Sequence, residues 1–451
     1  MSNDEVTALY FEDLYDFSNE DDVKRLQEKN QNLVVETHPM FSFMMCVYND
    51  MSLFNSAVNS LIKQSYTNWE LVILDNSDKN PLSWDMIQNA VKADPRVTAY
   101  KSEQNVGWPK GSSILLQYVR GKYTTFLAAD DCINADALEW LNAIALAEDP
   151  DVIWVGNMYI KQISDDEMSY VAENIPPYRI YQKDNRSETI YQIMSSVYYN
   201  SFFHYMKVDF LRKNGIDFFE PYYADGAGMT KAMVEADKMV SLDKPIYFLT
   251  LNTSQTVGRY TWGSYDSIFC NQWRCLREIF KRDQYIDMEH LYYVAGRILK
   301  NLFGNIAALC TGHCRNKYMT PIEKDTPEII QELEDCLASD EVAEMLQITG
   351  TEYFVELLDA IAYLPSADIS IYEDSWIYSC IMLSFYREQL SLEELIKVLL
   401  LWLLQEKNIR SMGFDYCVDL IDTMEDSALI PFYGSIQKIM DKYDTGLAIL
   451  C

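Results

Sequence analysis

Basic residues are scarce in this chain, and histidine is nearly absent. The 451 residues include 37 Lys and Arg against 68 Asp and Glu, with 4 His, so the formal net charge is -31. Nucleic acids and anionic membrane surfaces repel so acidic a protein, and we expect neither as a partner. A nucleotide ligand is not excluded, because a bound metal ion can neutralise its phosphates locally.

Long apolar runs are also missing. The nearest candidate, Val398–Leu404, is far shorter than the roughly 18 uncharged apolar residues that a membrane span requires. The amino terminus has neither the basic region nor the apolar core of a signal peptide. We therefore expect a cytoplasmic protein without a transmembrane segment.

No disulfide framework is evident. The ten cysteines are scattered, and Cys46 and Cys380 lie inside apolar runs, where reduced and buried thiols are common. Cys310, His313 and Cys314 have the spacing of half a zinc site. A fourth ligand is not nearby, so we do not assign zinc.

The length and the changing periodicity predict more than one domain. A chain of 52.4 kDa exceeds what one hydrophobic core usually organises. Residues 1–38 are acidic and helix-prone, residues 39–262 mix strands and helices, and residues 263–451 have almost wholly helical spacing. We expect an α-helical N-terminal extension, an α/β domain and an all-α C-terminal domain. The last could bind a partner, cover an acceptor or form a homo-oligomer.

Apolar runs that end in polar residues recur in the α/β part. The runs 41–48, 69–74 and 123–129 end before Asn49, Asp75 and Asp130, and helix-like segments separate them. Continuous apolar strands that alternate with helices favour a parallel sheet. Because right-handed crossovers place the strand exits at one edge, these polar residues should converge there.

The adjacent carboxylates Asp130 and Asp131 are the strongest single signal. Two acids at the exit of a buried strand are costly unless a positive charge lies nearby, and Mg²⁺ or Mn²⁺ prefers such oxygen ligands. The alternative is that the pair caps a helix beginning near Ala135.

Four motifs follow one another in the first part of the chain. They are VYND (47–50), SLIKQSYTNWELVILDNSD (60–78), DPRVTAYKSEQNVG (94–107) and GKYTTFLAADD (121–131). In this order they resemble family 2 glycosyltransferases, which are inverting nucleotide-sugar enzymes of the GT-A fold. The resemblance implies a Rossmann-like mixed sheet flanked by helices, a nucleotide-sugar donor, UDP-sugar above all, and a divalent metal.

Carried over position by position, the resemblance implies a donor site and a metal site. The implied donor-binding residues are Tyr48, Asn49, Asp75, Arg96, Lys110 and Asp130. Asp75 would read the base or ribose, and Arg96 would lie against the base. Asp131 would bind Mn²⁺ or Mg²⁺, although either acid of the pair could be the direct ligand. Without the resemblance, Asp75 could cap a turn and Arg96 could pair with a surface acid.

The motifs also depart from the common pattern. Ala128 stands where many relatives have the first Asp of the metal motif, so the chain reads Ala-Ala-Asp-Asp. After the Asn-x-Gly turn the chain continues Trp-Pro-Lys-Gly (108–111) in place of the usual glycines and arginine. Lys110 could supply positive charge to a phosphate or could remain in solvent.

An inverting transfer also needs a base, because the acceptor hydroxyl loses its proton as it attacks. The resemblance implies Asp225 in this role, with Glu220 as the alternative, while a helix-opening acid is the plain structural explanation of Asp225. The aromatic residues Tyr199, Phe202, Phe203 and Tyr205 precede it and could stack on a sugar or pack in the core. His204 is a further candidate for a phosphate or metal contact, and Arg259 for a phosphate contact.

Two other function classes remain open. A sugar nucleotidyltransferase could share this sheet, but its Gly-rich basic loop is not found in VYNDMSLFNS (47–56). A weakly catalytic binding or scaffold protein is the second alternative. The acceptor, whether glycan, lipid-linked or protein, is not specified by the sequence.

Overall fold

The computed structural model describes residues 2–182, 203–216, 218 and 225–251. These residues belong to one compact unit, which comprises Met1–Thr189 and Val197–Asn252. The boundary expected near residue 262, the all-α domain, Arg259 and the possible zinc half-site lie outside the described residues, as do Tyr199, Phe202 and Glu220.

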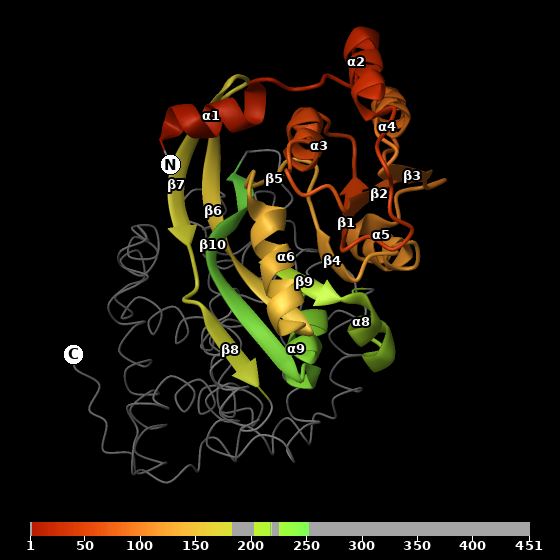
Figure 1. Cartoon of the computed structure of the whole chain (residues 1–451). Coiled ribbons are helices and arrows are strands. Elements are labelled where there is room, and N and C mark those ends of the chain that lie inside the picture. Colours follow the sequence, from red (N-terminus) through yellow and green to blue (C-terminus); the bar gives the residue numbers. More distant parts are fainter. Residues whose placement is uncertain (1, 183–202, 217, 219–224, 252–451) are drawn as a thin grey trace, which may run out of the picture. The chain divides into compact units, whose positions relative to one another are not determined.

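The described residues form a mixed sheet of ten strands in the order β3-β2-β1-β4-β9-β6-β10-β5, with β7 beside β6 and β8 beside β10 (Figure 1). The strands are β1 Phe41–Val47, β2 Trp69–Asp75, β3 Val97–Lys101, β4 Tyr123–Phe126, β5 Cys132–Ile133, β6 Val152–Ser164, β7 Glu167–Asn174, β8 Arg179–Gln182, β9 His204–Lys207 and β10 Lys238–Leu251. β1, β2, β3 and β4 pair in parallel, whereas β9 runs antiparallel between β4 and β6.

Helices precede the first strand and alternate with many of the later strands in the sequence. They are α1 Asn3–Phe11, α2 Glu20–Asn30, α3 Phe54–Ile62, α4 Pro81–Ala93, α5 Gly107–Leu116, α6 Ala137–Glu148, α8 Val208–Asn214 and α9 Asp225–Glu235. α4 shows how the sequence sets a helix start, because the Asn80 side chain caps it and Pro81 occupies its first turn. Within the described ranges, no helix has the length and apolarity to cross a bilayer.

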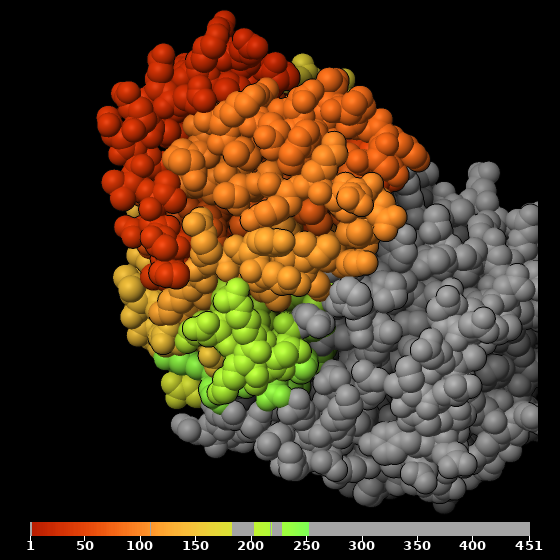
Figure 2. Space-filling view, turned by 90° about the vertical axis from the view of Figure 1, so that its right-hand side faces the viewer, coloured from red at the N-terminus to blue at the C-terminus, as the bar shows by residue number. Residues whose placement is uncertain are grey.

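The N-terminal segment is integrated into this unit. α1 begins with a capping box between Ser2 and Glu5 and buries Val6 and Tyr10 completely. The Thr7 hydroxyl donates to the carbonyl of Met168 in β7 at 3.1 Å. In the space-filling view the N-terminal residues, drawn in red, lie directly against the orange residues that follow them (Figure 2).

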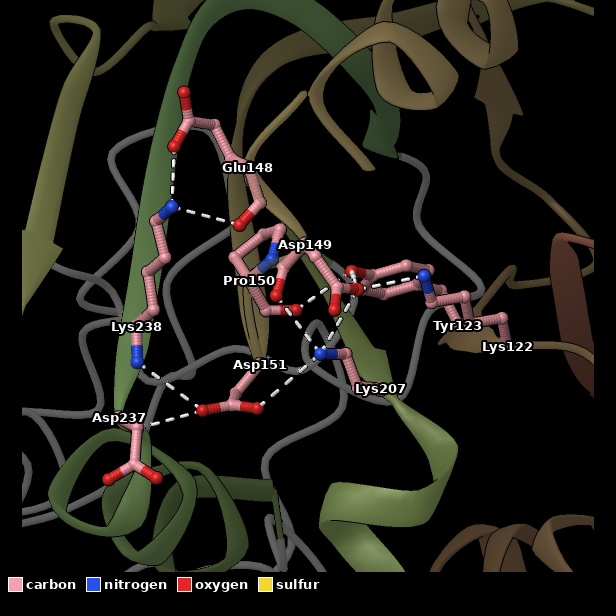
Figure 3. Close-up of polar contacts among 9 residues, drawn as sticks. All are labelled: Lys122, Tyr123, Glu148, Asp149, Pro150, Asp151, Lys207, Asp237 and Lys238. Atoms are coloured by element: carbon pink, nitrogen blue, oxygen red, sulfur yellow. Dashed lines mark hydrogen bonds and ion pairs between the residues drawn. The ribbon is translucent and has the colours of Figure 1, made fainter. Parts of the chain in front are cut away.

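Ion pairs close the edge of the sheet at which β4, β6 and β10 begin (Figure 3). Asp149 lies 2.7 Å from Nζ of Lys122 and 3.2 Å from Nζ of Lys207. Asp151 accepts from the backbone nitrogen of Lys238 at 3.3 Å and lies 3.8 Å from Nζ of Lys207. The hydrogen bond from Lys122 lowers the pKa of Asp149. Side chains thus join the starts of these strands at this edge of the sheet.

A buried carboxylate supports the same end of the parallel strands. Glu70 of β2 is 1% exposed and accepts from the Ser42 hydroxyl at 2.6 Å. It also accepts from the backbone nitrogen of Arg120 at 2.6 Å and from its Nε at 2.7 Å. These bonds tie β1, β2 and the residues before β4 together.

Replacing Glu70→Gln should destabilise the domain. The change removes the negative charge of the group that accepts these hydrogen bonds, and the NH₂ of the new amide would face other hydrogen-bond donors. We expect a loss of about 2 kcal/mol in the free energy of unfolding, measured by urea denaturation. The matched control is Lys24→Gln, whose ammonium lies 3.8 Å from Glu20 on the exposed side of α2. That change should cost less than about 0.5 kcal/mol. Equal losses in the two variants would contradict the assigned role of Glu70.

Candidate functional site

The exits of β1, β2 and β4 meet at one edge of the sheet. Val47 at the end of β1 pairs with Asp75 at the end of β2, and Met44 pairs with Phe126 at the end of β4. The structure therefore brings the loops after these strands together, as the alternation of strands and helices predicted. Tyr48, the first residue after β1, is 46% exposed at this edge.

Asn49 links the loop after β1 to the loop after β2. Its φ of +57° is left-handed, a conformation that Asn adopts more readily than most residues. Its side-chain oxygen accepts from the backbone nitrogens of Lys79 at 3.0 Å and Asn80 at 3.2 Å. Its side-chain nitrogen donates to Asp78 at 3.0 Å and lowers the pKa of that carboxyl. The Asn49 side chain thus holds the second loop in place.

Asp75 is fully buried at the end of β2. Its carboxylate accepts from the backbone nitrogen of Ser77 at 2.9 Å and from the Ser83 hydroxyl at 3.3 Å, and it lies 3.9 Å from Nζ of Lys101. The turn-capping role considered from the sequence is therefore present. Asp75 joins the β2 loop to the start of α4.

Lys110 lies near the same edge. It is exposed in the first turn of α5. Asn76 connects that turn to the end of β2, because its side-chain nitrogen donates to the carbonyl of Gly107 at 3.3 Å and its oxygen accepts from Val106 at 3.5 Å. The ammonium group of Lys110 is free to reach solvent or an anion.

Arg96 does not join this group. It precedes β3, and the carbonyl of Arg96 accepts from Leu71 near the start of β2, so the residue lies toward the edge opposite to Asp75. Its guanidinium donates to buried Asp94 at 2.6 and 3.0 Å and stacks on the ring of Trp69 at 3.8 Å. Arg96 thus pairs with an acid, as the alternative reading of the sequence expected, but that acid is buried and not at the surface. We leave Arg96 out of the proposed donor site.

The acid pair follows β4 at the exit edge. Asp131 is 4% exposed, and its two carboxylate oxygens accept from the Tyr247 hydroxyl at 2.5 Å and from the Thr250 backbone nitrogen at 2.7 Å. Asp130 is partly exposed. Neither acid caps α6, because the short strand β5 and then Asp136 separate them from it.

Burial sets the electrostatics of this turn. It raises the pKa of the Asp131 carboxyl well above its usual range, and the neighbouring charge of Asp130 raises it further. Burial likewise raises the pKa of the Tyr247 hydroxyl. The site is therefore an environment in which a nearby positive charge would stabilise the ionised carboxylates.

The residues present fit a hard divalent cation. Mg²⁺ and Mn²⁺ are commonly held by one or two carboxylates, with phosphate oxygens and water completing the shell. Asp130 offers a partly exposed carboxylate, and the oxygens of Asp131 retain lone pairs beyond their hydrogen bonds. Across the part of the chain that the structure describes, no three His, Cys, Asp or Glu side chains gather as a ligand cluster. Such a site would depend on the phosphates of a bound nucleotide.

The remaining candidates occupy other positions. Asp225 is the first residue of α9, and its side chain lies outside the described part. His204 is fully buried in β9 opposite Trp154. Phe203 packs edge-on against Tyr247 at 5.5 Å, and Tyr205 is fully buried in the core. These two aromatic rings therefore pack in the interior.

Two residues that hold the acid pair were not found by sequence reasoning. Tyr247 and Thr250 belong to β10, and Tyr247 is 116 residues away from its partner Asp131. The segment IYFLTL (246–251) has the composition of a strand. Its composition gives no indication of which strand or turn it neighbours.

Comparison with known proteins gives a family match for the α/β part of the chain. Residues 42–208 match the family model of Glycosyl transferase family 2. These residues form a family 2 glycosyltransferase domain. The family expected from the four motifs is confirmed.

Curated relatives align with the family 2 domain over short stretches. An uncharacterized glycosyltransferase of Haemophilus influenzae is 36% identical over 101 residues, which are 22% of this chain and 40% of that protein. The Escherichia coli protein WfgD, a UDP-Glc:alpha-D-GlcNAc-diphosphoundecaprenol beta-1,3-glucosyltransferase, is 27% identical over 100 residues, or 22% of this chain and 38% of its own length. The chain thus spans about two fifths of the length of these relatives.

A solved structure supports the fold. Residues 1–349 of S. aureus TarS, crystallised with UDP-GlcNAc, superpose with a TM-score of 0.53 at 17% identity, covering 78% of this chain and 92% of that chain. The predicted α/β fold of the GT-A type is confirmed. The predicted all-α C-terminal domain lies outside the described residues.

The role of Asn49 can be divided into backbone and side-chain parts. Asn49→Gly should lose the hydrogen bonds to the β2 loop but keep the left-handed backbone, whereas Asn49→Ala should lose both. We expect Asn49→Ala to be less stable than Asn49→Gly by about 1 kcal/mol in urea unfolding. A variant pair of equal stability would show that the positive φ is not a constraint at this position.

Proposed function

We propose that the family 2 domain is a metal-dependent, inverting glycosyltransferase that moves a sugar from a UDP-sugar to an acceptor hydroxyl. The observation that carries this proposal is the acid pair at the β4 exit, at the same edge as the loops after β1 and β2. The family match includes all three loops. Both TarS, crystallised with UDP-GlcNAc and with UDP, and WfgD, named for UDP-Glc, favour a UDP-sugar as the donor.

The nucleotide would lie against the loops after β1 and β2. Tyr48 presents an exposed ring there, and Lys110 presents an exposed ammonium group that could approach a phosphate. Asn49 and Asp75 would act mainly by shaping the loops, because their side chains are engaged in the hydrogen bonds described above. A direct contact between Asp75 and the base stays a prediction.

We assign the direct metal contact to Asp130 and the supporting role to Asp131, which exchanges the assignment made from the sequence. Asp130 is the more exposed acid, whereas both oxygens of Asp131 already accept from protein donors. A bound Mn²⁺ or Mg²⁺ would offset the charge that develops on the departing diphosphate.

The acceptor would be activated by a carboxylate. Displacement with inversion requires the hydroxyl to attack the anomeric carbon opposite the diphosphate and to lose its proton as the new bond forms. Asp225 is our candidate base, supported by the family resemblance and by its place at the start of α9. The acceptor class, a homo-oligomer and a cytoplasmic location stay predictions.

The donor proposal is tested by nucleotide release. The protein should release UDP from a matching UDP-sugar in the presence of Mn²⁺, and Asp130→Asn should lower the Mn²⁺-dependent rate by roughly 100-fold, because it removes the proposed ligand. Asp165→Asn removes the same charge from the exposed β6–β7 turn and should leave the rate unchanged. Pyrophosphate release from a nucleoside triphosphate would instead identify a nucleotidyltransferase, and no turnover at all would favour a binding protein.

The base is tested separately from donor binding. Asp225→Asn should lower kcat for transfer by roughly 10²–10⁴-fold, because the amide cannot accept the proton of the acceptor hydroxyl. UDP binding, followed by isothermal titration calorimetry with Mn²⁺, should remain within about twofold of the unaltered protein. Wild-type kcat in this variant would eliminate Asp225 as the base. NMR of the anomeric proton of the product would show whether the configuration is inverted.

A further inference from the structure

The first helix of the chain packs directly behind the acid pair. Val6 and Tyr10 of α1 form one buried cluster with Cys132, the residue after Asp131, and with Phe248 of β10. Ser56 of α3 fixes the same helix, because its hydroxyl donates to the backbone carbonyl of Tyr10 at 2.5 Å. α1 therefore has a defined position relative to the turn that carries the acids.

A chain of hydrogen bonds leads from α1 to this turn. The hydroxyls of Tyr10 and Thr250 lie 2.7 Å apart, and the Thr250 hydroxyl donates to the backbone carbonyl of Asp130 at 2.5 Å. Because the single proton of the Thr250 hydroxyl lies toward Asp130, the Tyr10 hydroxyl donates across the 2.7 Å contact, and the carbonyl of Phe248, at 3.4 Å, is its more distant acceptor. The Thr250 backbone nitrogen donates to the Asp131 carboxylate, which also accepts from Tyr247. One residue of β10 thus contacts both acids, and Tyr10 supports it.

Burial makes these bonds hard to replace. Tyr10 and Thr250 are both fully buried, so water cannot substitute for a hydroxyl that is removed. Consecutive hydrogen bonds also polarise one another, so the donation from Tyr10 strengthens the bond from Thr250 to Asp130. The position of the Asp130–Asp131 turn therefore depends on the Tyr10 hydroxyl of α1, which acts on the turn through the Thr250 hydroxyl.

Neither end of this support belongs to the matched family segment. The match covers residues 42–208, whereas Tyr10 precedes it and Thr250 follows it. We infer that Tyr10 and Thr250 are positioning residues that hold the Asp130–Asp131 turn in the geometry that binds the metal–diphosphate unit. The N-terminal helix would then be a required part of the donor site. The positioning of the turn by Tyr10 and Thr250 is inferred from the hydrogen bonds, whereas the role of that turn in binding metal and diphosphate rests on the proposed function.

The test replaces single hydroxyls and keeps side-chain shape. In Tyr10→Phe, hydrogen exchange followed by mass spectrometry should be about tenfold faster in peptides that contain Asp131 and Thr250, because one hydrogen bond of the chain is lost. Binding of Mn²⁺ in the presence of UDP, measured from the electron paramagnetic resonance signal of free Mn²⁺, should weaken roughly 3- to 10-fold. Thr250→Val should have both effects, and Thr250→Ser, which keeps the hydroxyl, should restore both.

Tyr123→Phe is the matched control. Its hydroxyl is buried too, but it donates to the carbonyl of Pro150 at 2.8 Å, at the ion-paired edge of the sheet. This variant should lose a similar amount of thermal stability, while Mn²⁺ affinity and exchange at the acid turn stay as in the unaltered protein. The comparison separates positioning of the acids from general stabilisation.

The outcomes separate the two proposals. If the unaltered protein binds no Mn²⁺ with UDP, the metal part of the proposed function fails, and the exchange measurement still decides the inference. If Tyr10→Phe exchanges at the acid turn as the unaltered protein does, the inference is overturned. The same holds if Tyr10→Phe and Tyr123→Phe weaken Mn²⁺ binding equally. Should Tyr10→Phe fail to fold, the pair Thr250→Val and Thr250→Ser gives the same decision.

Discussion

Parallel pairing of β1 with β2 and β4 is the constraint on which the rest of the domain depends. The pairing is in register from Phe41 onward, so the three strands end within a short distance of one another. Each strand is almost wholly buried, and the more exposed polar residues follow where it leaves the sheet. The side chains of Asn49 and Asn76 then join the exit loops to one another and to α5. The shape of the edge is thereby fixed before any ligand arrives.

The acid pair is the energetically demanding part of this edge. A carboxylate as buried as Asp131 loses most of its hydration, and its raised pKa reflects that cost. The hydrogen bonds from Tyr247 and Thr250 recover part of the loss, and the neighbouring Asp130 adds repulsion. A divalent cation at Asp130 would relieve both the repulsion and the burial cost. The same arrangement thus explains why the turn needs internal support, and it is consistent with the proposed metal ion.

Local patterns predicted much of this domain and failed where the contacts are distant. The strands β1, β2 and β4 begin where the apolar runs 41–48, 69–74 and 123–129 begin, and the three polar exits share an edge because topology requires it. Arg96 shows the limit, since a motif next to a strand does not reveal that its side chain turns toward Asp94 and Trp69. Tyr10, Tyr247 and Thr250 show a second limit. Their partners are more than a hundred residues away, and no local pattern encodes such pairings.

The position of β10 has a consequence for how this protein can be divided. β10 lies between β6 and β5 inside the sheet, although it follows the recognised segment 42–208 in sequence. A fragment cut to those limits would expose one whole flank of β6 and would strip the covering from Cys132. Recombinant fragments and chimeras should therefore include all of residues 2–251. The segment that similarity identifies, residues 42–208, is shorter than the segment that we expect to fold.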